Sequence, residues 1–207
     1  MISRLTWTFL AFLIIATLIA SIGIVLDSAI LVISAMVLGP EFGPIAALCV
    51  AAVHGRRHIA RRAALSFVLG FVAAISVTTA LALVSRWLGW IGNSTLDGER
   101  PATGFITQPD KWSFIVAFIA GVAGVLALTS SKSGGLVGVF ISVTTVPAAG
   151  DLSLAIALGN GGEIGSSLTQ LSVNVAALLL AGTLTLLVQK LVWRHVPGTR
   201  PGRAHFT

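Results

Sequence analysis

Two carboxylates stand inside long apolar stretches of this 207-residue chain. Glu41 follows Pro40 in the middle of one stretch, and Asp151 follows Pro147 by four residues in another. A charged side chain at the centre of a bilayer costs about 3 kcal/mol on insertion scales, so such groups usually face a partner or a cavity. These two carboxylates are therefore the first candidates for chemistry.

Two roles are open to Glu41 and Asp151. Each could cap the N-terminus of a half-helix, where a carboxylate accepts hydrogen bonds from free N–H groups and meets the positive end of the helix dipole. Each could instead bind or carry a proton or a cation. An anion site at these half-helix N-termini is disfavoured, because the carboxylates would occupy or repel that position. Capping and transport do not exclude one another.

Neutral polar side chains accompany the carboxylates. Thr144 and Thr145 lie just before Pro147, and Gln170 and Asn174 lie four residues apart, on one face of a predicted helix. They either line a pathway or join helices by hydrogen bonds, as polar residues do in membranes. The candidate substrate- or ion-binding residues are Glu41, Asp151, Pro40, Pro147, Thr144, Thr145, Gln170 and Asn174.

The composition is that of a membrane protein. Hydrophobic residues make up 56% of the chain and charged residues 10%, against about 25% charged in a typical soluble domain. The mean hydropathy is +0.97. We therefore predict that residues 1–207 form a single transmembrane domain with membrane lipids as partners. A net charge of +6 would suggest nucleic acid in a soluble protein, but membrane topology explains it here, so no nucleic-acid partner is expected.

Six apolar segments are predicted, each long enough for the roughly 20 residues that one crossing needs. They span about 5–26, 29–53, 63–87, 113–130, 134–158 and 166–193. We predict helices, because a transmembrane barrel strand alternates apolar and polar residues and these segments do not. The first segment is too long for a signal-peptide core and is expected to be a retained helix. The fold class is thus an all-α membrane protein.

The basic residues predict the orientation. With the N-terminus in the cytoplasm and six crossings, only Arg86, Arg100 and Lys111 lie outside, as the positive-inside rule requires. The inner side would hold Arg4, Arg56, Arg57, Arg61, Arg62, Lys132, Lys190, Arg194, Arg200 and Arg203. The outer side would hold the acids Asp27, Asp97, Glu99, Asp110 and Glu163. The sequence thus predicts a multi-pass protein of a bacterial cytoplasmic membrane, with both termini in the cytoplasm.

The two halves of the chain match at an offset of about 106 residues, which places Pro40 against Pro147. Repeat one is about 5–87, an interfacial loop resting on the lipid headgroups is about 88–112, repeat two is about 113–193, and a basic tail follows at 194–207. Each half contains three crossings, so the halves would be inverted. Two proline-broken helices in inverted halves are typical of transporter sites near the membrane midplane.

The cysteine and histidine side chains do not indicate a catalytic or metal site. Cys49 is the single cysteine, and it lies in an apolar stretch. His54 and His58 lack a third metal ligand nearby and stand among four arginines. We find no nucleophile–base pair, so we expect no enzyme activity, no metal and no cofactor.

Two stretches resemble a known family. Residues 34–44, Ser-Ala-Met-Val-Leu-Gly-Pro-Glu-Phe-Gly-Pro, are similar to the first signature of the bacterial domain-of-unknown-function 389 family. Residues 120–129 followed by 138–147, which end in Thr-Thr-Val-Pro, are similar to the second. The resemblance covers about residues 20–190. It implies a hydrophobic membrane protein without an established activity, and it carries over no catalytic residue.

The leading functional hypothesis is a small secondary transporter or channel for a cation, a proton or a small solute. The alternative is a structural or lipid-interacting membrane scaffold in which the helix breaks serve packing alone. Six segments make a thin bundle around a pathway, so a homo-oligomer is expected. A transporter needs Glu41 or Asp151 to reach a cavity, whereas a scaffold buries both against donors.

Overall fold

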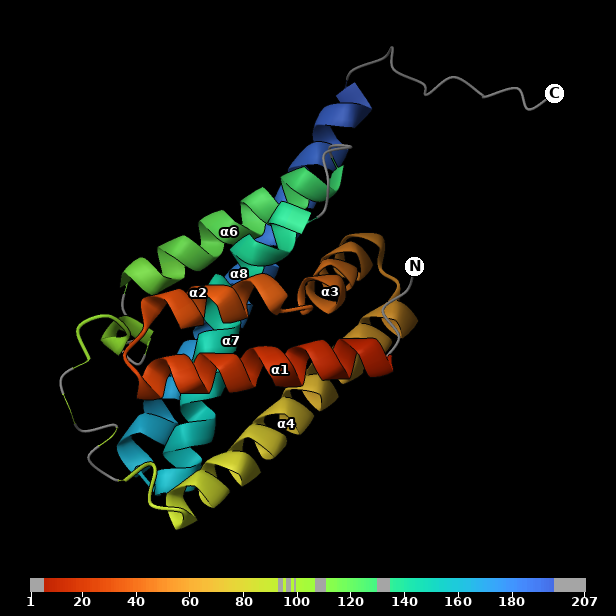
Figure 1. Cartoon of the computed structure of the whole chain (residues 1–207). Helices are drawn as coiled ribbons and strands as arrows, with labels where there is room; N and C mark the ends of the chain where they lie inside the picture. The colour runs from red at the N-terminus through yellow and green to blue at the C-terminus, as the bar shows by residue number, and fades with distance from the viewer. Residues whose placement is uncertain are drawn as a thin grey trace.

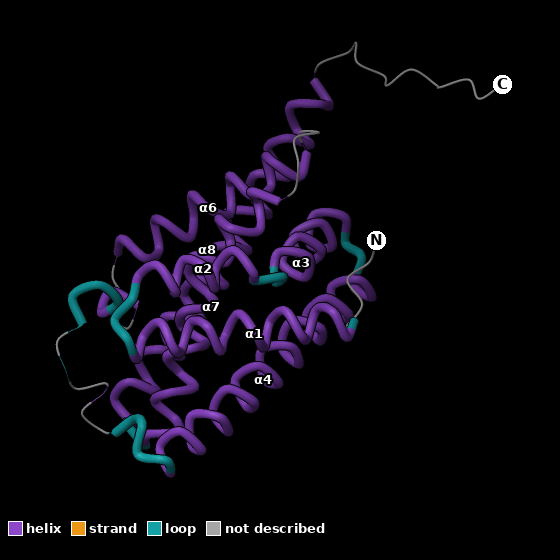
Figure 2. Tube along the Cα trace, viewed as in Figure 1, coloured by secondary structure: helices purple, strands orange, loops and turns teal. Residues whose placement is uncertain are grey.

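A computed structural model describes residues 6–92, 95, 98, 100–106, 111–129 and 135–195, without the side chains of 105, 128, 135–144 and 193–195. Within these residues the protein is helical and has no strand (Figures 1 and 2), which confirms the all-α class. The elements are α1 (Trp7–Val25), α2 (Ala29–Leu38), α3 (Phe42–His54), α4 (Arg57–Trp87), the 3-10 turn η1 (Gly104–Ile106), α6 (Lys111–Thr129), α7 (Gly135–Leu158) and α8 (Gly161–His195).

Helix α7 is the centre of the bundle and touches each of the other α-helices (Figure 1). Residues 145–155 of α7 are all buried. Small side chains make this possible, because they let neighbouring backbones approach closely. At Gly150, for example, an added Cβ would lie 3.0 Å from both Ala20 Cβ and Ser21 N of α1. The centre of the fold is therefore a helix that the other helices enclose on all sides.

The predicted break near Pro40 is present. Gly39 has an extended backbone, with φ −61° and ψ 120°, and α2 and α3 meet there at a bend of 55°. The residue before a proline avoids the helical region, and Pro40 lacks the N–H that would continue the ladder. Gly43 and Pro44 follow directly. Four poor helix formers within six residues therefore end α2 and start α3 in a new direction.

The predicted second break at Pro147 is wrong. Helix α7 continues from Gly135 to Leu158 with Pro147 inside it. An internal proline removes one backbone hydrogen bond and costs about 3 kcal/mol in an isolated helix. Here the flanking Val146 and Ala148 are fully buried among other helices, and this packing holds the helical path. A buried helix can therefore contain one proline, whereas the two glycines and two prolines at 39–44 end the helix.

Among the residues that the structure describes, three helices are long and apolar enough to cross a membrane: α1, α4 and α8. The bent pair of α2 and α3 makes a fourth if it counts as one span. The described parts of α6 and α7 contain shorter apolar stretches, Lys111–Ala127 and Thr145–Leu158. At 1.5 Å per residue, the 31 residues of α4 measure about 46 Å, more than the roughly 30 Å of a hydrocarbon core.

Three predicted boundaries move, and one of them is the start of α8, which lies at Gly161 instead of residue 166. Helix α4 begins at Arg57, so most of the basic stretch predicted as a turn at 54–62 forms the first turns of a helix. Helix α6 begins at Lys111, inside the predicted loop of 88–112. The predicted turn at 131–133 and the tail beyond 195 lie outside the described residues.

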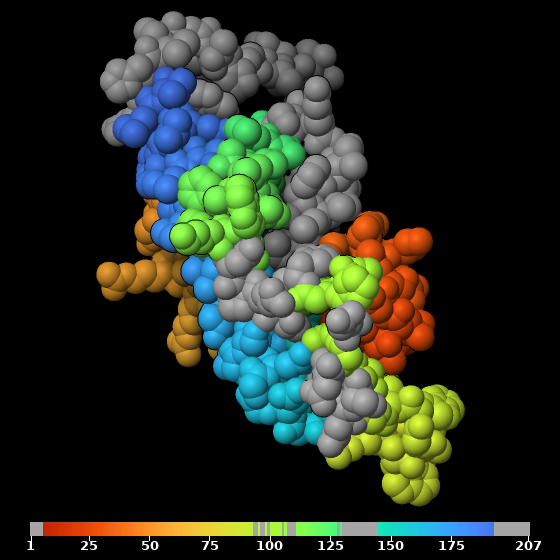
Figure 3. All heavy atoms as spheres, turned by 90° about the vertical axis from the view of Figure 1, so that its left-hand side faces the viewer, coloured from red at the N-terminus to blue at the C-terminus, as the bar shows by residue number. Residues whose placement is uncertain are grey.

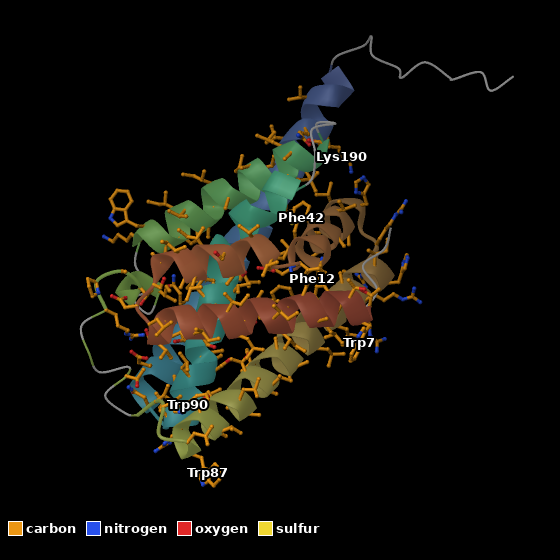
Figure 4. All side chains as sticks on the ribbon, in the orientation of Figure 1. Trp7, Phe12, Phe42, Trp87, Trp90 and Lys190 are labelled. Carbon is orange, nitrogen blue, oxygen red and sulfur yellow. The ribbon has the colours of Figure 1, made fainter. Side chains whose placement is uncertain are left out.

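The surface carries many exposed apolar side chains, which suits contact with lipid rather than water. Among those more than half exposed are Ile30, Val68, Leu69, Val72, Ile119, Leu180 and Val188. Tryptophans mark two levels of this surface: Trp7 lies at one end of the bundle, and Trp87 and Trp90 lie at the other (Figure 4). Tryptophan favours membrane–water interfaces, so the helices have the polarity of a membrane bundle.

Close packing of α6 on α8 is expected to depend on Gly121. A Cβ added there would lie 2.8 Å from Ala181 Cβ and 2.9 Å from Leu178 O, and the backbone oxygen has no rotamer by which to move away. Gly121→Ala should therefore destabilise the protein by about 1–3 kcal/mol, measured by thermal unfolding in detergent. The control is Gly165→Ala in α8, where nothing lies within 4 Å of the new Cβ. It should gain up to about 1 kcal/mol of helix propensity; equal effects would contradict the packing argument.

Candidate functional site

Glu41 lies at the bend between α2 and α3 and is completely buried. The bend turns its side chain toward the central helix, where Thr145 Oγ1 donates a hydrogen bond of 2.7 Å to Glu41 Oε1. Both residues have no exposed surface. The two candidate residues are 104 positions apart in the sequence and meet in the core.

Asn174 of α8 lies near this level. Glu41 directly precedes Phe42, which packs in one apolar cluster with Ala177 and Leu178 of α8. Asn174 precedes Ala177 by three residues, about one helical turn, so we assign it to the same layer of the bundle as Glu41. Asn174 is fully buried.

Gln170 extends this layer by one turn of α8. Its side chain is 5% exposed, and its Oε1 atom has no hydrogen-bond partner among the described residues. An unpaired buried amide oxygen costs about 1–3 kcal/mol. We name Glu41, Thr145, Gln170 and Asn174 the central polar layer. Pro40 shapes it by fixing the bend beside Glu41, and the side chain of Thr144 lies outside the described residues.

Asp151 does not belong to this layer. It is six residues beyond Thr145 on α7, a rise of about 9 Å. It is fully buried and accepts hydrogen bonds from Ser167 Oγ of α8 and from Arg100 Nη1, the latter at 3.2 Å. The fold therefore does not place Glu41 and Asp151 in one shared site, as the sequence predicted. The two carboxylates belong to separate clusters.

Arg100 links Asp151 to a second acid. One guanidinium nitrogen bonds Asp151, and the other bonds Glu163 Oε1 at the start of α8. The arginine side chain is only 8% exposed, and that of Glu163 is 18% exposed. A planar guanidinium suits such a fork, because its donors lie in a fixed plane. Two carboxylates and one guanidinium form a nearly closed ionic cluster at the Trp87–Trp90 end of the bundle.

The segment that carries Arg100 enters the bundle. Thr103 is fully buried, and Ile106 is 4% exposed and packs with Ile24 and Leu158. Figure 3 views this end, with the yellow-green segment lying against the red-orange turn of α1 and α2. Within the predicted interfacial loop, residues 100–106 therefore pack against the end of the helical bundle through Thr103 and Ile106.

Asp27 holds the same segment from the other side. It takes a left-handed backbone, φ 44°, at the end of α1, where Ser28 N donates to Gly23 O at 2.7 Å. Aspartate tolerates this conformation better than most residues. The turn directs its carboxylate to Thr103 Oγ1 at 2.8 Å and Thr103 N at 2.9 Å. The Thr103 hydroxyl contributes most to lowering the pKa of Asp27 below its ordinary value of 3.8.

The lowered pKa of Asp27 predicts a pH dependence. A carboxylate with a folded pKa below the unfolded one stabilises the protein above the unfolded pKa, and this contribution is lost as the pH falls through the folded pKa. We expect wild type to unfold at a higher temperature than Asp27→Asn at pH 6, with the gap closing below pH 3.8. Asparagine tolerates the left-handed backbone and can still accept from Thr103, but it loses the charge and the hydrogen bond from Ala102 N. A gap that is constant with pH would contradict the argument.

The capping interpretation is wrong for both carboxylates. Glu41 occupies the N-cap position of α3 but makes no side-chain cap hydrogen bond. Asp151 lies within α7 because that helix does not break. Both carboxylates instead bond side chains of other segments. The sequence predicts capping because a helix that starts after a break has free N–H groups for a carboxylate to bond. Helix α7 does not start near Asp151, so it offers no such groups there.

Charge also gathers at the opposite end of the molecule. The first turns of α4 expose Arg56, Arg57, Arg61 and Arg62. Phe9 near the start of α1 packs against Gly70 of α4, so these turns project beyond the Trp7 end. Lys190 of α8 reaches Val53 O at 3.3 Å on the same side (Figure 4). These exposed arginines thus lie at the end opposite to the cluster of Arg100, Asp151 and Glu163.

Sequence reasoning missed Arg100, Ser167 and Glu163 as partners of Asp151. A signal existed: a buried charge requires a counter-charge, and only three basic residues were placed on the side toward which Asp151 lies. What the sequence lacked was the distance between a loop and a helix 51 residues apart. Within the described residues, no group of three His, Cys, Asp or Glu side chains could hold a metal.

The apolar helices and the buried polar clusters define the class as a helical protein of the membrane type. A family model described as a domain of unknown function, DUF389, matches residues 36–180. The chain belongs to this family, which confirms the resemblance. It is also 28% identical over 169 residues, 82% of its length, to the uncharacterized protein MJ0678 of Methanocaldococcus jannaschii. The chain spans about half the length of that relative. No solved structure matches it.

Proposed function

We propose that this protein is a small secondary transporter or channel for a proton, a monovalent cation or a small solute, with Glu41 at its centre. One observation carries the proposal: an ionisable carboxyl group is fully buried at a broken helix in the core and bonded to Thr145. A glutamine would accept the same hydrogen bond without the cost of about 3 kcal/mol for a buried charge. A role in packing alone gives no reason for the acid.

The chemistry of the central polar layer favours a proton or a hard cation. Glu41, Thr145, Gln170 and Asn174 offer carboxylate, hydroxyl and amide oxygens, which are the ligands that hard cations prefer. The Oε1 atom of Gln170, which has no partner among the described residues, adds an acceptor that a hydrogen-bond donor or a cation could satisfy. The carboxylate would repel an anion at this position.

The arrangement corresponds to an occluded state. Glu41 has no exposed surface, and the segment of Arg100 covers the bundle end that Asp151 approaches. Transport would require this segment to release Asp151 and Glu163, so that one end opens while the basic end stays closed. In this scheme Asp151 belongs to the gate, and Glu41 is the group that binds.

We also propose six crossings, an inverted three-plus-three repeat, cytoplasmic termini and a bacterial cytoplasmic membrane. The separation of exposed arginines from the acidic cluster supports this orientation under the positive-inside rule. Each half has a helix, a middle segment with a proline, and a long last helix, α4 or α8. Labelling of single cysteines placed at Arg57 and Trp90 from either side of the membrane would test the orientation.

A scaffold is the second candidate, and a specific observation favours it. Both Glu41 and Asp151 are fully buried, and each bonds protein donors. This is the arrangement expected if the polar clusters only fix the packing. The two candidates differ in one measurable property, which is permeation of an ion or solute.

The test uses purified protein in sealed liposomes. Proton flux is followed with an internal pH dye, and flux of monovalent cations and of a small anion panel with ion-sensitive dyes. We expect proton or cation flux above that of empty liposomes and no anion flux. An equal rate in empty and loaded liposomes for all these ions would favour the scaffold. Native mass spectrometry of the same sample tests the proposed homo-oligomer, which a single-copy mass would contradict.

A further inference from the structure

A cavity of about 470 Å³ opens between α1 and α4 near the Trp87–Trp90 end. Its lining is almost entirely apolar and comes from α1, α4, the turn after α4 and Leu154 of α7. Thr78 lies in the wall, is 1% exposed, and its hydroxyl has no partner among the described residues. We call this cavity the α1–α4 groove.

The rim of the groove belongs to the lipid-facing surface. Ile22 is 51% exposed, Leu81 47% and Trp90 75%, and all three line the groove. Apolar side chains of this exposure surround the opening, so in a bilayer the groove meets hydrocarbon rather than water. Trp90 places its outer edge at the level where tryptophan indoles meet lipid headgroups and ester groups.

The volume of the groove distinguishes between a helix and a hydrocarbon chain as its occupant. A helix is about 10 Å wide, so a helix from a second copy would fill 470 Å³ with about 6 Å of its length, little more than one turn. The size lies within the range of about 300–1,000 Å³ that is usual for pockets that take small ligands. A flexible hydrocarbon chain is narrower than a helix and can enter lengthwise from the surrounding lipid.

We infer that the α1–α4 groove binds one acyl chain of a bilayer phospholipid, with its ester region beside Trp90 and Ser85. Burial of methylene groups against Leu18, Ile22 and Leu154 provides the binding free energy. Trp90 belongs to the lining near the bundle end, and its indole N–H can donate to an ester oxygen, whereas the Ser85 hydroxyl donates to Leu81 O at 3.0 Å. This site is independent of the proposed transport function.

The first test is native mass spectrometry of the full chain released from detergent micelles that contain phosphatidylglycerol and phosphatidylethanolamine. We expect one retained phospholipid on wild type. Ser85→Phe, which fills the groove, should lose it, and Val84→Phe should keep it, because Val84 is exposed and does not line the groove. Equal retention in both variants, or none on wild type, would overturn the inference. So would a dimer that Ser85→Phe alone dissociates, because the groove would then hold a second copy.

Fluorescence locates the chain. In a variant with Trp90 as the single tryptophan, phospholipid with mid-chain bromines should quench the indole, and Ser85→Phe should weaken the quenching. A second single-tryptophan protein, with Trp87 retained, serves as control, because Trp87 is 86% exposed and outside the groove. Thr78→Val should increase retention, since it replaces an unpaired hydroxyl with an apolar group of the same shape. Decreased retention in Thr78→Val would show a polar occupant and contradict the acyl chain.

Discussion

Arg100→Gln is expected to destabilise the protein by about 3–5 kcal/mol, because it leaves the buried Asp151 without its counter-charge. The side chain of Asp151 is fully buried and that of Arg100 is 8% exposed, so solvent screens the pair little. Without the guanidinium, two carboxylates of the same cluster would also face one another. The measurement is the thermal midpoint of the protein in detergent, followed by size-exclusion chromatography after heating.

A double mutant separates charge from lost packing. Arg100→Gln with Asp151→Asn removes both members of the pair and should recover a large part of the lost stability, because no buried charge remains on α7. Lys111→Gln is the matched control, since Lys111 is an exposed base at the start of the next helix. If the Arg100→Gln protein is as stable as the Lys111→Gln protein, the ionic cluster does not hold the segment of Arg100 in place.

Glu41→Gln is expected to reduce proton or cation flux more than about tenfold, because hydrogen bonds to charged groups contribute about 1.5–3 kcal/mol and the amide cannot ionise. Glutamine has nearly the same shape and still accepts from Thr145. The fold should therefore survive, and stability should rise, because the charged group leaves the core. Flux in liposomes and the thermal midpoint are measured on the same preparation.

The paired outcome separates the two candidate functions. Lost flux with raised stability supports a functional carboxylate, since a change that abolished flux by disturbing the fold would lower stability as well. Unchanged flux in Glu41→Gln would show that the Glu41 carboxylate takes no part in transport. Thr145→Val serves as a comparison, because it takes away the hydroxyl that bonds Glu41 and leaves the carboxylate in place. It should lower flux less than Glu41→Gln and also lower stability.

Local chemistry made much of the fold predictable. Long apolar runs predict helices because each backbone group must find a partner inside its own segment. The cluster from Gly39 to Pro44 predicts the bend, which the structure has. The spacing of Gln170 and Asn174 predicts one helical face, and both are buried on α8. The choice of Glu41 and Thr145 as candidates also needed only their types and positions, and they are in contact.

Other features depended on neighbours distant in sequence. Pro147 fits both a broken and a continuous helix, and the choice depends on whether the surrounding helices hold the backbone straight. Arg100 is one basic residue in a polar stretch until the fold places it between Asp151 and Glu163. Capping of α3 by Glu41 was plausible locally, yet Thr145 of another helix offers its hydroxyl instead.

Short-range rules predict the class of protein, most of the helices, the bend at Pro40 and the residues whose burial requires a partner. These rules are hydropathy, backbone geometry and the cost of burying charge. Which partner each group has depends on tertiary packing, which divides Glu41 and Asp151 between two clusters about 9 Å apart along α7. The reason is that a charge in an apolar core must be paired, but many pairings satisfy this rule, and only the packing of whole helices selects one.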